Sequence, residues 1–107
     1  MENSWNFTTK DVINASSSIA LQTLKGKQFN IVGATIAERP DENGEIRSIG
    51  LFKRDDGMIL STISESVIRN IPTIIEYVKE SGDSVLPVQL NSGKSSNNRE
   101  FITLILL

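Results

Sequence analysis

The strongest constraint on the fold is a single segment with apolar residues at helical spacing, set between segments that favour strands. Its apolar residues recur at three- and four-residue steps: Val67, Ile68, Ile71, Ile74, Ile75 and Val78. This pattern predicts an amphipathic helix near residues 65–81, capped by Ser64 or Ser66. Pro72 is expected to break or kink this helix, or to open a second short helix, because proline lacks the N–H donor.

Three segments before this helix are rich in strand-forming residues and are joined by tight turns. They are Phe29–Ala37, Glu45–Arg54 and Met58–Ile63. The first turn ends in Asn43-Gly44 and the second in Gly57, and both sequences favour hairpins. Gly33 inside the first strand predicts a bulge or a sharp bend. Together these signals predict a three-stranded antiparallel meander.

Two further strands are expected after the helix, at Val85–Asn91 and Glu100–Leu107. A polar loop, Ser92–Asn98, separates them. The last strand is almost continuously apolar, which predicts that it is buried on both faces and that Phe101 lies in the core.

The order of these elements indicates the fold class. A helix between the third and fourth of five strands is the order of the OB-fold, a five-stranded Greek-key barrel. We therefore expect one domain, mainly β with α, with a β-β-β-α-β-β barrel of this kind at residues 29–107. An N-terminal helical extension is expected at residues 1–28, capped by Thr8 or Thr9 and ending near Gly26.

Composition narrows the range of functions. The 107 residues include no cysteine and no histidine, which excludes disulfides, thiol catalysis, Ser-His-Asp systems and cysteine-ligated metals. We therefore expect neither an enzyme nor a cofactor, although carboxylate pairs and Ser-Lys pairs remain chemically possible. Turn chemistry explains the acidic clusters Asp41-Glu42 with Glu45 and Asp55-Asp56 better than a metal site does. No apolar run is long enough to span a membrane, and the N-terminus lacks the pattern of a secretory signal.

A formal net charge of −2 argues against a protein that coats duplex nucleic acid by bulk charge, so any such contact needs a local basic patch. Strand Glu45–Arg54 offers Arg47, Phe52, Lys53 and Arg54. The alternation of side chains along a strand places Phe52 on the same face as Arg54, which suggests a base-stacking ring beside a phosphate contact. The alternative is a core phenylalanine at a bulged register or under the N-terminal helix.

The loop before the last strand is a second basic candidate. Lys94 and Arg99 stand there among amide and hydroxyl side chains, and residues 92–99 contain no acid. This composition fits a flap that closes on a phosphate backbone, and the alternative is a solvated hairpin loop. Gly93-Lys94-Ser95 is not a P-loop, because Val88 stands where that motif requires glycine.

Two segments resemble those of small bacteriophage single-stranded-DNA-binding proteins. They are Asp56–Ser64, where an acidic turn and a glycine lead a strand into a Ser/Thr helix cap, and Gly93–Leu104, where a Lys/Ser/Asn/Arg loop leads into the last strand. Bacterial members of the wider class end in an acidic tail that recruits partners. This chain ends in Leu104-Ile105-Leu106-Leu107, so recruitment by a tail is not implied.

The resemblance implies non-catalytic, largely sequence-independent binding of single-stranded DNA, which protects single strands in phage replication or recombination in the bacterial cytoplasm. The expected DNA-binding residues are Arg47, Phe52, Lys53, Arg54, Lys94 and Arg99. We also expect a homodimer or higher homo-oligomer, with Trp5 and Phe7 packing on the core or on a second subunit, and contacts with replication or recombination proteins. The alternative function is an OB-like protein-interaction module or inhibitor that does not bind nucleic acid.

Overall fold

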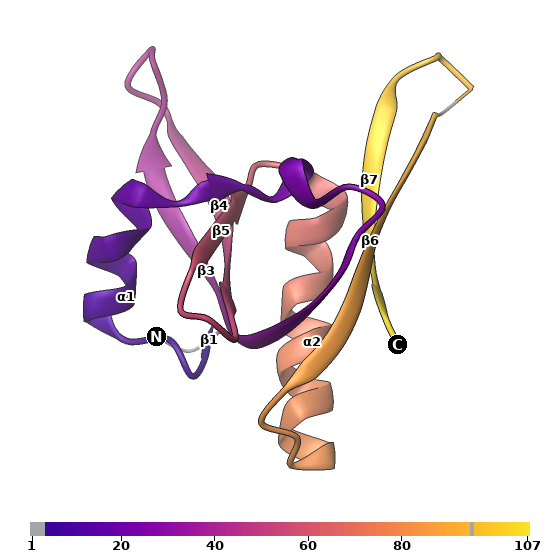
Figure 1. Ribbon diagram of the computed structural model, residues 1–107. Helices are drawn as coiled ribbons and strands as arrows, with labels where there is room; N and C mark the ends of the chain where they lie inside the picture. Colours follow the sequence, from indigo (N-terminus) through magenta and orange to yellow (C-terminus); the bar gives the residue numbers. More distant parts are fainter. Residues whose placement is uncertain (1–3, 95) are drawn as a thin grey trace.

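The chain folds around one strongly curled sheet (Figure 1). The computed structural model describes residues 4–94 and 96–107, and within them seven strands pair in the order β2-β5-β4-β3-β6-β7, with β1 beside β3. The strands are β1 (Ser4–Trp5), β2 (Ile19–Ala20), β3 (Gln28–Pro40), β4 (Ile46–Arg54), β5 (Ile59–Thr62), β6 (Leu86–Lys94) and β7 (Glu100–Leu106). The helices are α1 (Thr9–Asn14) and α2 (Glu65–Ser81), with short 3-10 turns η1 (Ala15–Ser17) and η2 (Leu21–Leu24).

The predicted meander, helix and final hairpin are confirmed, in the form of an open half-barrel. β3, β4 and β5 pair antiparallel, α2 follows, and β6 and β7 form the last hairpin. The first part of β3 pairs with β6 and the rest pairs with β4, so both halves belong to one sheet. In the described residues β2 lies parallel to β5 and occupies its outer edge. In a closed barrel, that edge of β5 would pair with β7. The arrangement therefore fits an OB-like fold, with more strands than the expected five and no closure.

Gly33 lies at the predicted irregularity in β3. The register with β4 shifts between Ile31 and Gly33, which is the signature of a bulge. A Cβ atom on Gly33 would lie 2.8 Å from the carbonyl oxygen of Asn6 and 3.0 Å from that of Trp5. Glycine is thus required here because the N-terminal segment passes directly over the strand.

The N-terminal segment is less helical than predicted. Thr8 caps α1 through a reciprocal capping box with Asp11, but α1 ends at Asn14 and the chain continues through η1, β2 and η2. The consecutive serines that follow α1 compete for backbone hydrogen bonds, which explains the early end of the helix. The segment adds two strands to the sheet and contributes Phe7 and Leu21 to the core.

Of the outcomes expected at Pro72, a break and a second short helix are wrong, because α2 is one continuous helix of 17 residues. Pro72 lies on the exposed side of the helix, while residues such as Ile71 and Ile75 pack into the core. Gly82 ends α2 in the left-handed conformation at φ 74°. In the described part of the chain, no helix is both long and apolar enough to cross a membrane.

Both faces of β4 are covered in its middle, at Gly50–Phe52. Phe52 packs on the α2 side, in the same cluster as Ile71 and Leu60, whereas Leu51 packs with Phe7 and other residues of the N-terminal segment on the opposite side. β7 differs from this pattern, since it is an edge strand. Its residues Ile102 and Leu104 face the core, but Phe101 and Ile105 are exposed. The expectation that this strand is buried on both faces is therefore wrong.

Candidate nucleic-acid interface

Phe52 does not form a stacking platform. Its side chain is fully buried in the core cluster on the α2 side of the sheet. A ring with no exposed surface cannot offer a face to a base, so the stacking role predicted for Phe52 is wrong. Phe52 is a core residue, as in the alternative, but it lies in regular register and is covered by α2 and not by the N-terminal helix. Alternation within β4 correctly separates Phe52 from Leu51, but it cannot show that both faces of the strand are buried at these two residues.

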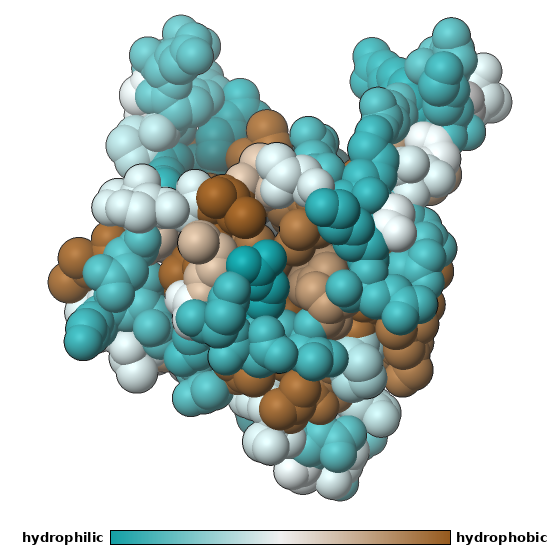
Figure 2. Space-filling view, viewed as in Figure 1, coloured by the Kyte–Doolittle hydropathy of each residue, from teal (hydrophilic) through white to brown (hydrophobic). Residues whose placement is uncertain are grey.

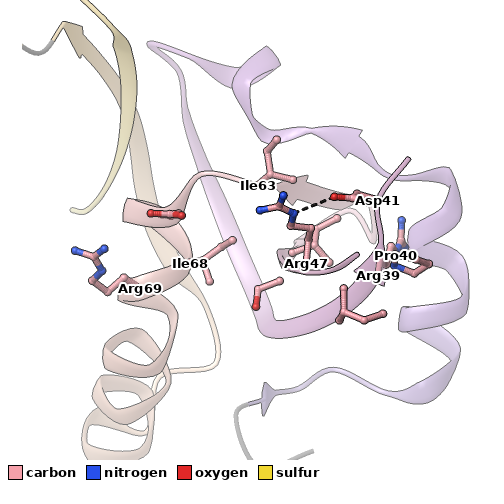
Figure 3. Close-up of a pocket in the computed structure, with 11 residues that line it drawn as sticks. Arg39, Pro40, Asp41, Arg47, Ile63, Ile68 and Arg69 are labelled. Atoms are coloured by element: carbon pink, nitrogen blue, oxygen red, sulfur yellow. Dashed lines mark hydrogen bonds and ion pairs between the residues drawn. The ribbon is translucent and has the colours of Figure 1, made fainter. Parts of the chain in front are cut away.

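Two of the predicted cations on β4 are held by acids of the adjoining turns. Arg47 is 65% exposed and contacts Asp41 at 3.0 Å (Figure 3). It also contacts Glu45 at 3.1 Å. Arg54 donates from Nε and Nη2 to both carboxylate oxygens of Asp56, at 3.0 and 2.6 Å. The hydrogen bond from Arg54 lowers the pKa of Asp56 to about 2, and the bond from Arg47 lowers the pKa of Asp41. A phosphate would have to compete with these carboxylates.

The third cation of β4, Lys53, is part of the packing of the N-terminal segment. Its ammonium group lies 2.9 Å from the carboxylate of Asp11 in α1 and 5.8 Å from the ring centre of Phe7. Partial burial opposes ionisation of Asp11, but the hydrogen bonds from Lys53 and from Thr8 outweigh it and lower the pKa of Asp11. We therefore assign Lys53 a structural role, joining α1 to the sheet.

The other two predicted cations, Lys94 and Arg99, are exposed at the tip of the β6–β7 hairpin. Within residues 4–94 and 96–107, neither of their side chains has an ion pair or a hydrogen bond. Figure 1 shows this hairpin projecting beyond the body of the molecule. We call its outer part, residues 91–94 and 96–103, the β6–β7 arm.

Phe101 lies on this arm and is the aromatic residue that the apolar pattern of the last strand placed wrongly in the core. Its side chain is 45% exposed, and it pairs in register with Gly93 on β6. A Cβ atom on Gly93 would lie 2.8 Å from Cζ of Phe101, so the ring lies directly over the glycine backbone. The absence of a side chain at Gly93 thus lets the ring lie flat on the strand, with its other face turned outward.

Amide side chains continue the same face of the sheet toward Phe101. Gln28 donates to Gln89 at 3.4 Å, and Gln89 donates to Asn91 at 3.0 Å. Asn91 and Gly93 are two residues apart on β6, so they share a face. Amides of this kind can both donate to phosphates and bond to base edges.

The opposite face of the arm carries Lys94 and Glu100, which pair in register. Glu100 forms an ion pair with Lys25, and this ion pair joins the arm to the turn that precedes β3. The exposed ring and the amides make the face of Phe101 the side of the arm best suited to bases, and Lys94 extends from the opposite face near the tip.

A sequence signal for Phe101 existed in the pairing of the final hairpin. A polar loop between Lys94 and Arg99 sets Gly93 opposite Phe101, and a glycine opposite an aromatic residue is a common way to accommodate a ring on a strand surface. The continuous apolar run of β7 concealed this signal, because it resembles a strand that is buried on both faces.

The acidic turns are explained by local hydrogen bonds. Asp41 accepts from the backbone N–H groups of Asn43 and Glu45 at 2.8 and 3.0 Å, in addition to Arg47. Asp56 likewise accepts from the N–H group of Met58. In the part of the chain that the structure describes, no group of three or more carboxylates is arranged to hold a metal ion.

Comparison with known proteins agrees with an interface for nucleic acid. The family model described as "Phage Single-stranded DNA-binding protein" matches residues 11–107, nearly the whole chain. No curated protein and no solved structure matches the chain. The match confirms the resemblance noted in the sequence, and the chain belongs to the family of phage single-stranded DNA-binding proteins.

Proposed function

We propose that this member of the phage family binds single-stranded DNA without catalysis and with little sequence preference, through the β6–β7 arm. One observation carries the proposal: Phe101 lies half-exposed over Gly93, next to the tip of the arm, where the side chains of Lys94 and Arg99 are exposed and have no ion pair in the described residues. Binding of this kind combines cations that follow the phosphates with flat side chains that stack on bases.

Stacking explains why the preference should be for single strands over duplexes. Every base has a face that can lie on Phe101, but a duplex hides those faces between its base pairs. The amides at Gln89 and Asn91 add hydrogen bonds that do not require one particular base. Arg47, Lys53 and Arg54 would reach a phosphate only by giving up a carboxylate, so they contribute less than Lys94 and Arg99.

Protection of single strands in phage replication or recombination, in the cytoplasm of the host, is the role that fits such an interface. It requires neither a cofactor nor a metal. As part of this role, the proposal includes contacts between this chain and replication or recombination proteins.

Self-association is a further part of the proposal, because one arm with one exposed aromatic ring holds a strand weakly and several linked arms hold it firmly. Phe7 is buried in the smaller core cluster and the half-buried Trp5 packs against the larger one, which is the first of the two roles expected for them. β7 offers an edge with exposed Ile105 and Leu106. Light scattering should find a homodimer or a higher homo-oligomer, and a strict monomer at high concentration would contradict this part.

The central experiment is a fluorescence-anisotropy titration of labelled oligo-dT at several salt concentrations. Each phosphate contact on a single strand contributes roughly −0.7 to the slope of log affinity against log salt. Lys94→Gln and Arg99→Gln should each flatten the slope by about that amount. Lys79→Gln, which removes an exposed charge from the last turn of α2, is the matched control and should leave the slope unchanged.

The outcomes separate DNA binding from the alternative function. A folded protein that fails to bind oligo-dT at low salt contradicts the proposal and favours a protein-interaction module. Equal affinity for duplex DNA would contradict the stacking role of Phe101 while leaving the phosphate contacts in place.

A further inference from the structure

A groove of about 770 Å³ lies between the β3–β4 hairpin and the first turns of α2. Figure 3 shows Ile68 and Arg69 of α2 on one side and Arg39, Pro40 and Asp41 at the end of β3 on the other. No residue that lines it belongs to the β6–β7 arm. The groove is therefore separate from the proposed DNA site, and its role does not depend on that proposal.

Aliphatic side chains that are exposed to solvent line the groove. Ile63 is 78% exposed and Ile46 is 63% exposed, and both line the groove together with Ile49 and Ile68. Figure 2 shows hydrophobic residues reaching the surface between the two hydrophilic hairpins. Such exposure of isoleucine in a concave site marks a surface that another molecule covers.

The charges around these side chains favour an acidic partner. Arg39 and Arg69 also line the groove, and in the described residues neither has an ion pair. The lining residues comprise three arginines and two carboxylates, Asp41 and Glu65, so the lining carries a net positive charge, and Arg47 is the arginine that is paired with Asp41. Arginine at the edge of an apolar groove is a frequent centre of binding energy in protein interfaces.

DNA fits this groove poorly. None of its lining residues is aromatic, so a base would find no ring on which to stack. An aliphatic floor suits the apolar side chains of a peptide, and the free arginines suit its carboxylates.

From this juxtaposition we infer that the groove between the β3–β4 hairpin and α2 binds a short acidic segment of a partner protein. Its aliphatic or aromatic side chains cover Ile46, Ile63 and Ile68, and its Asp or Glu residues pair with Arg39 and Arg69. The chain thus has two binding surfaces, one for nucleic acid and one for protein.

The test is a selection from a displayed library of short random peptides on the full chain, followed by anisotropy with the enriched peptide. Enriched sequences should combine Asp or Glu with Leu, Ile, Met or Phe. Arg69→Glu and Ile63→Ser should each weaken binding about tenfold or more, the equivalent of about 1.4 kcal/mol. Because both side chains are exposed, neither change should alter the urea unfolding midpoint.

Two matched control variants change residues outside the groove lining. Lys79→Glu reverses another exposed charge on α2, and Ile13→Ser removes another exposed isoleucine, 67% exposed on α1. Both should bind the peptide as the unchanged protein does, and all four variants should keep their affinity for oligo-dT. The inference is overturned if no acidic sequence is enriched, or if Arg69→Glu binds the peptide normally. It is equally overturned if Ile63→Ser and Arg69→Glu lose oligo-dT instead, since the groove would then be part of the DNA path.

Discussion

Two phenylalanines of the sheet, one on β4 and one on the edge strand β7, should respond to truncation in opposite ways. Phe52 is fully buried under α2, whereas Phe101 lies half-exposed over Gly93. We predict that Phe52→Ala costs stability with no change in the DNA affinity of the folded protein. Phe101→Ala should cost DNA affinity with little change in stability.

The magnitudes depend on burial. Truncation of a buried phenylalanine to alanine costs about 3–5 kcal/mol, which lowers Tm by more than about 10 °C in a domain of this size. Complete burial of a phenylalanine side chain contributes about 1.5–3 kcal/mol, and only about half of Phe101 is buried. Its truncation should therefore cost about 1 kcal/mol of stability, against about 1–3 kcal/mol of binding free energy from one lost stacking contact.

The assay measures both quantities on each variant. Urea unfolding can be followed by the fluorescence of Trp5, the single tryptophan, which packs against the core. Oligo-dT anisotropy at one fixed salt concentration gives the affinity. Because Phe52→Ala can unfold a marginal domain, Phe52→Leu and Phe101→Leu form a second matched pair that retains most of the side-chain volume.

The stacking role of Phe101 is refuted if Phe101→Leu binds oligo-dT as tightly as the unchanged protein. It is refuted equally if Phe52→Leu, shown to be folded, loses affinity to the same extent as Phe101→Leu. In that case the ring of Phe52 would have to become accessible on binding, and the arm would not be the stacking surface.

Three other substitutions test particular contacts. Asp11→Asn should lower the free energy of unfolding at pH 7 by about 1–3 kcal/mol, because it removes the charged acceptor of Lys53. The lowered pKa of Asp11 means that this stability is present above its ordinary pKa of about 4 and is lost as the pH falls through the folded-state value. Urea unfolding at pH 7 and pH 3 should therefore show a smaller acid effect in the variant. Gly50→Ala should cost about 1–3 kcal/mol in urea unfolding, since the new Cβ would lie 2.9 Å from Cδ1 of Ile71, and an unchanged midpoint would contradict this packing. Gly93→Ala should displace the Phe101 ring and weaken oligo-dT binding in the anisotropy assay, and equal affinity would show that the ring does not need the glycine.

Much of the fold could be predicted because its signals are local. Helical spacing located α2 to the residue at both ends, and the Asn-Gly and Asp-Gly turns located the hairpins. Gly33 indicated the bulge in β3. Each of these features depends on residues within a few positions of one another, so one sequence contains the whole signal.

The wrong predictions concern which elements cover each face of the sheet. That coverage depends on residues far apart in the chain. Alternation grouped Phe52 with the exposed end of its strand, but it could not show that α2 packs over that face. The apolar run of β7 indicated burial, but it could not show that β2 occupies the sheet edge beside β5 and leaves β7 at the other edge. The ion pair of Lys53 with Asp11 is also long-range, whereas that of Arg54 with Asp56 spans two residues and could have been expected from the turn.

The strand β3 is shared between the two halves of the sheet, and this has a mechanical consequence. β6 is held beside β3 along Gln28–Ile31 and by hydrogen bonds between Leu90 and the residues Gly26 and Lys27. The other strand of the hairpin is held by α2, because Ile102 is buried in the core cluster and its carbonyl oxygen accepts a hydrogen bond from Oγ of Ser66. The pairs Gly93–Phe101 and Lys94–Glu100 lie beyond this anchor and form the end of a two-stranded ribbon. The hairpin is thus clamped at its base between β3 and α2, and bending that leaves the core packing intact is confined to the segment that carries Phe101, Lys94 and Arg99.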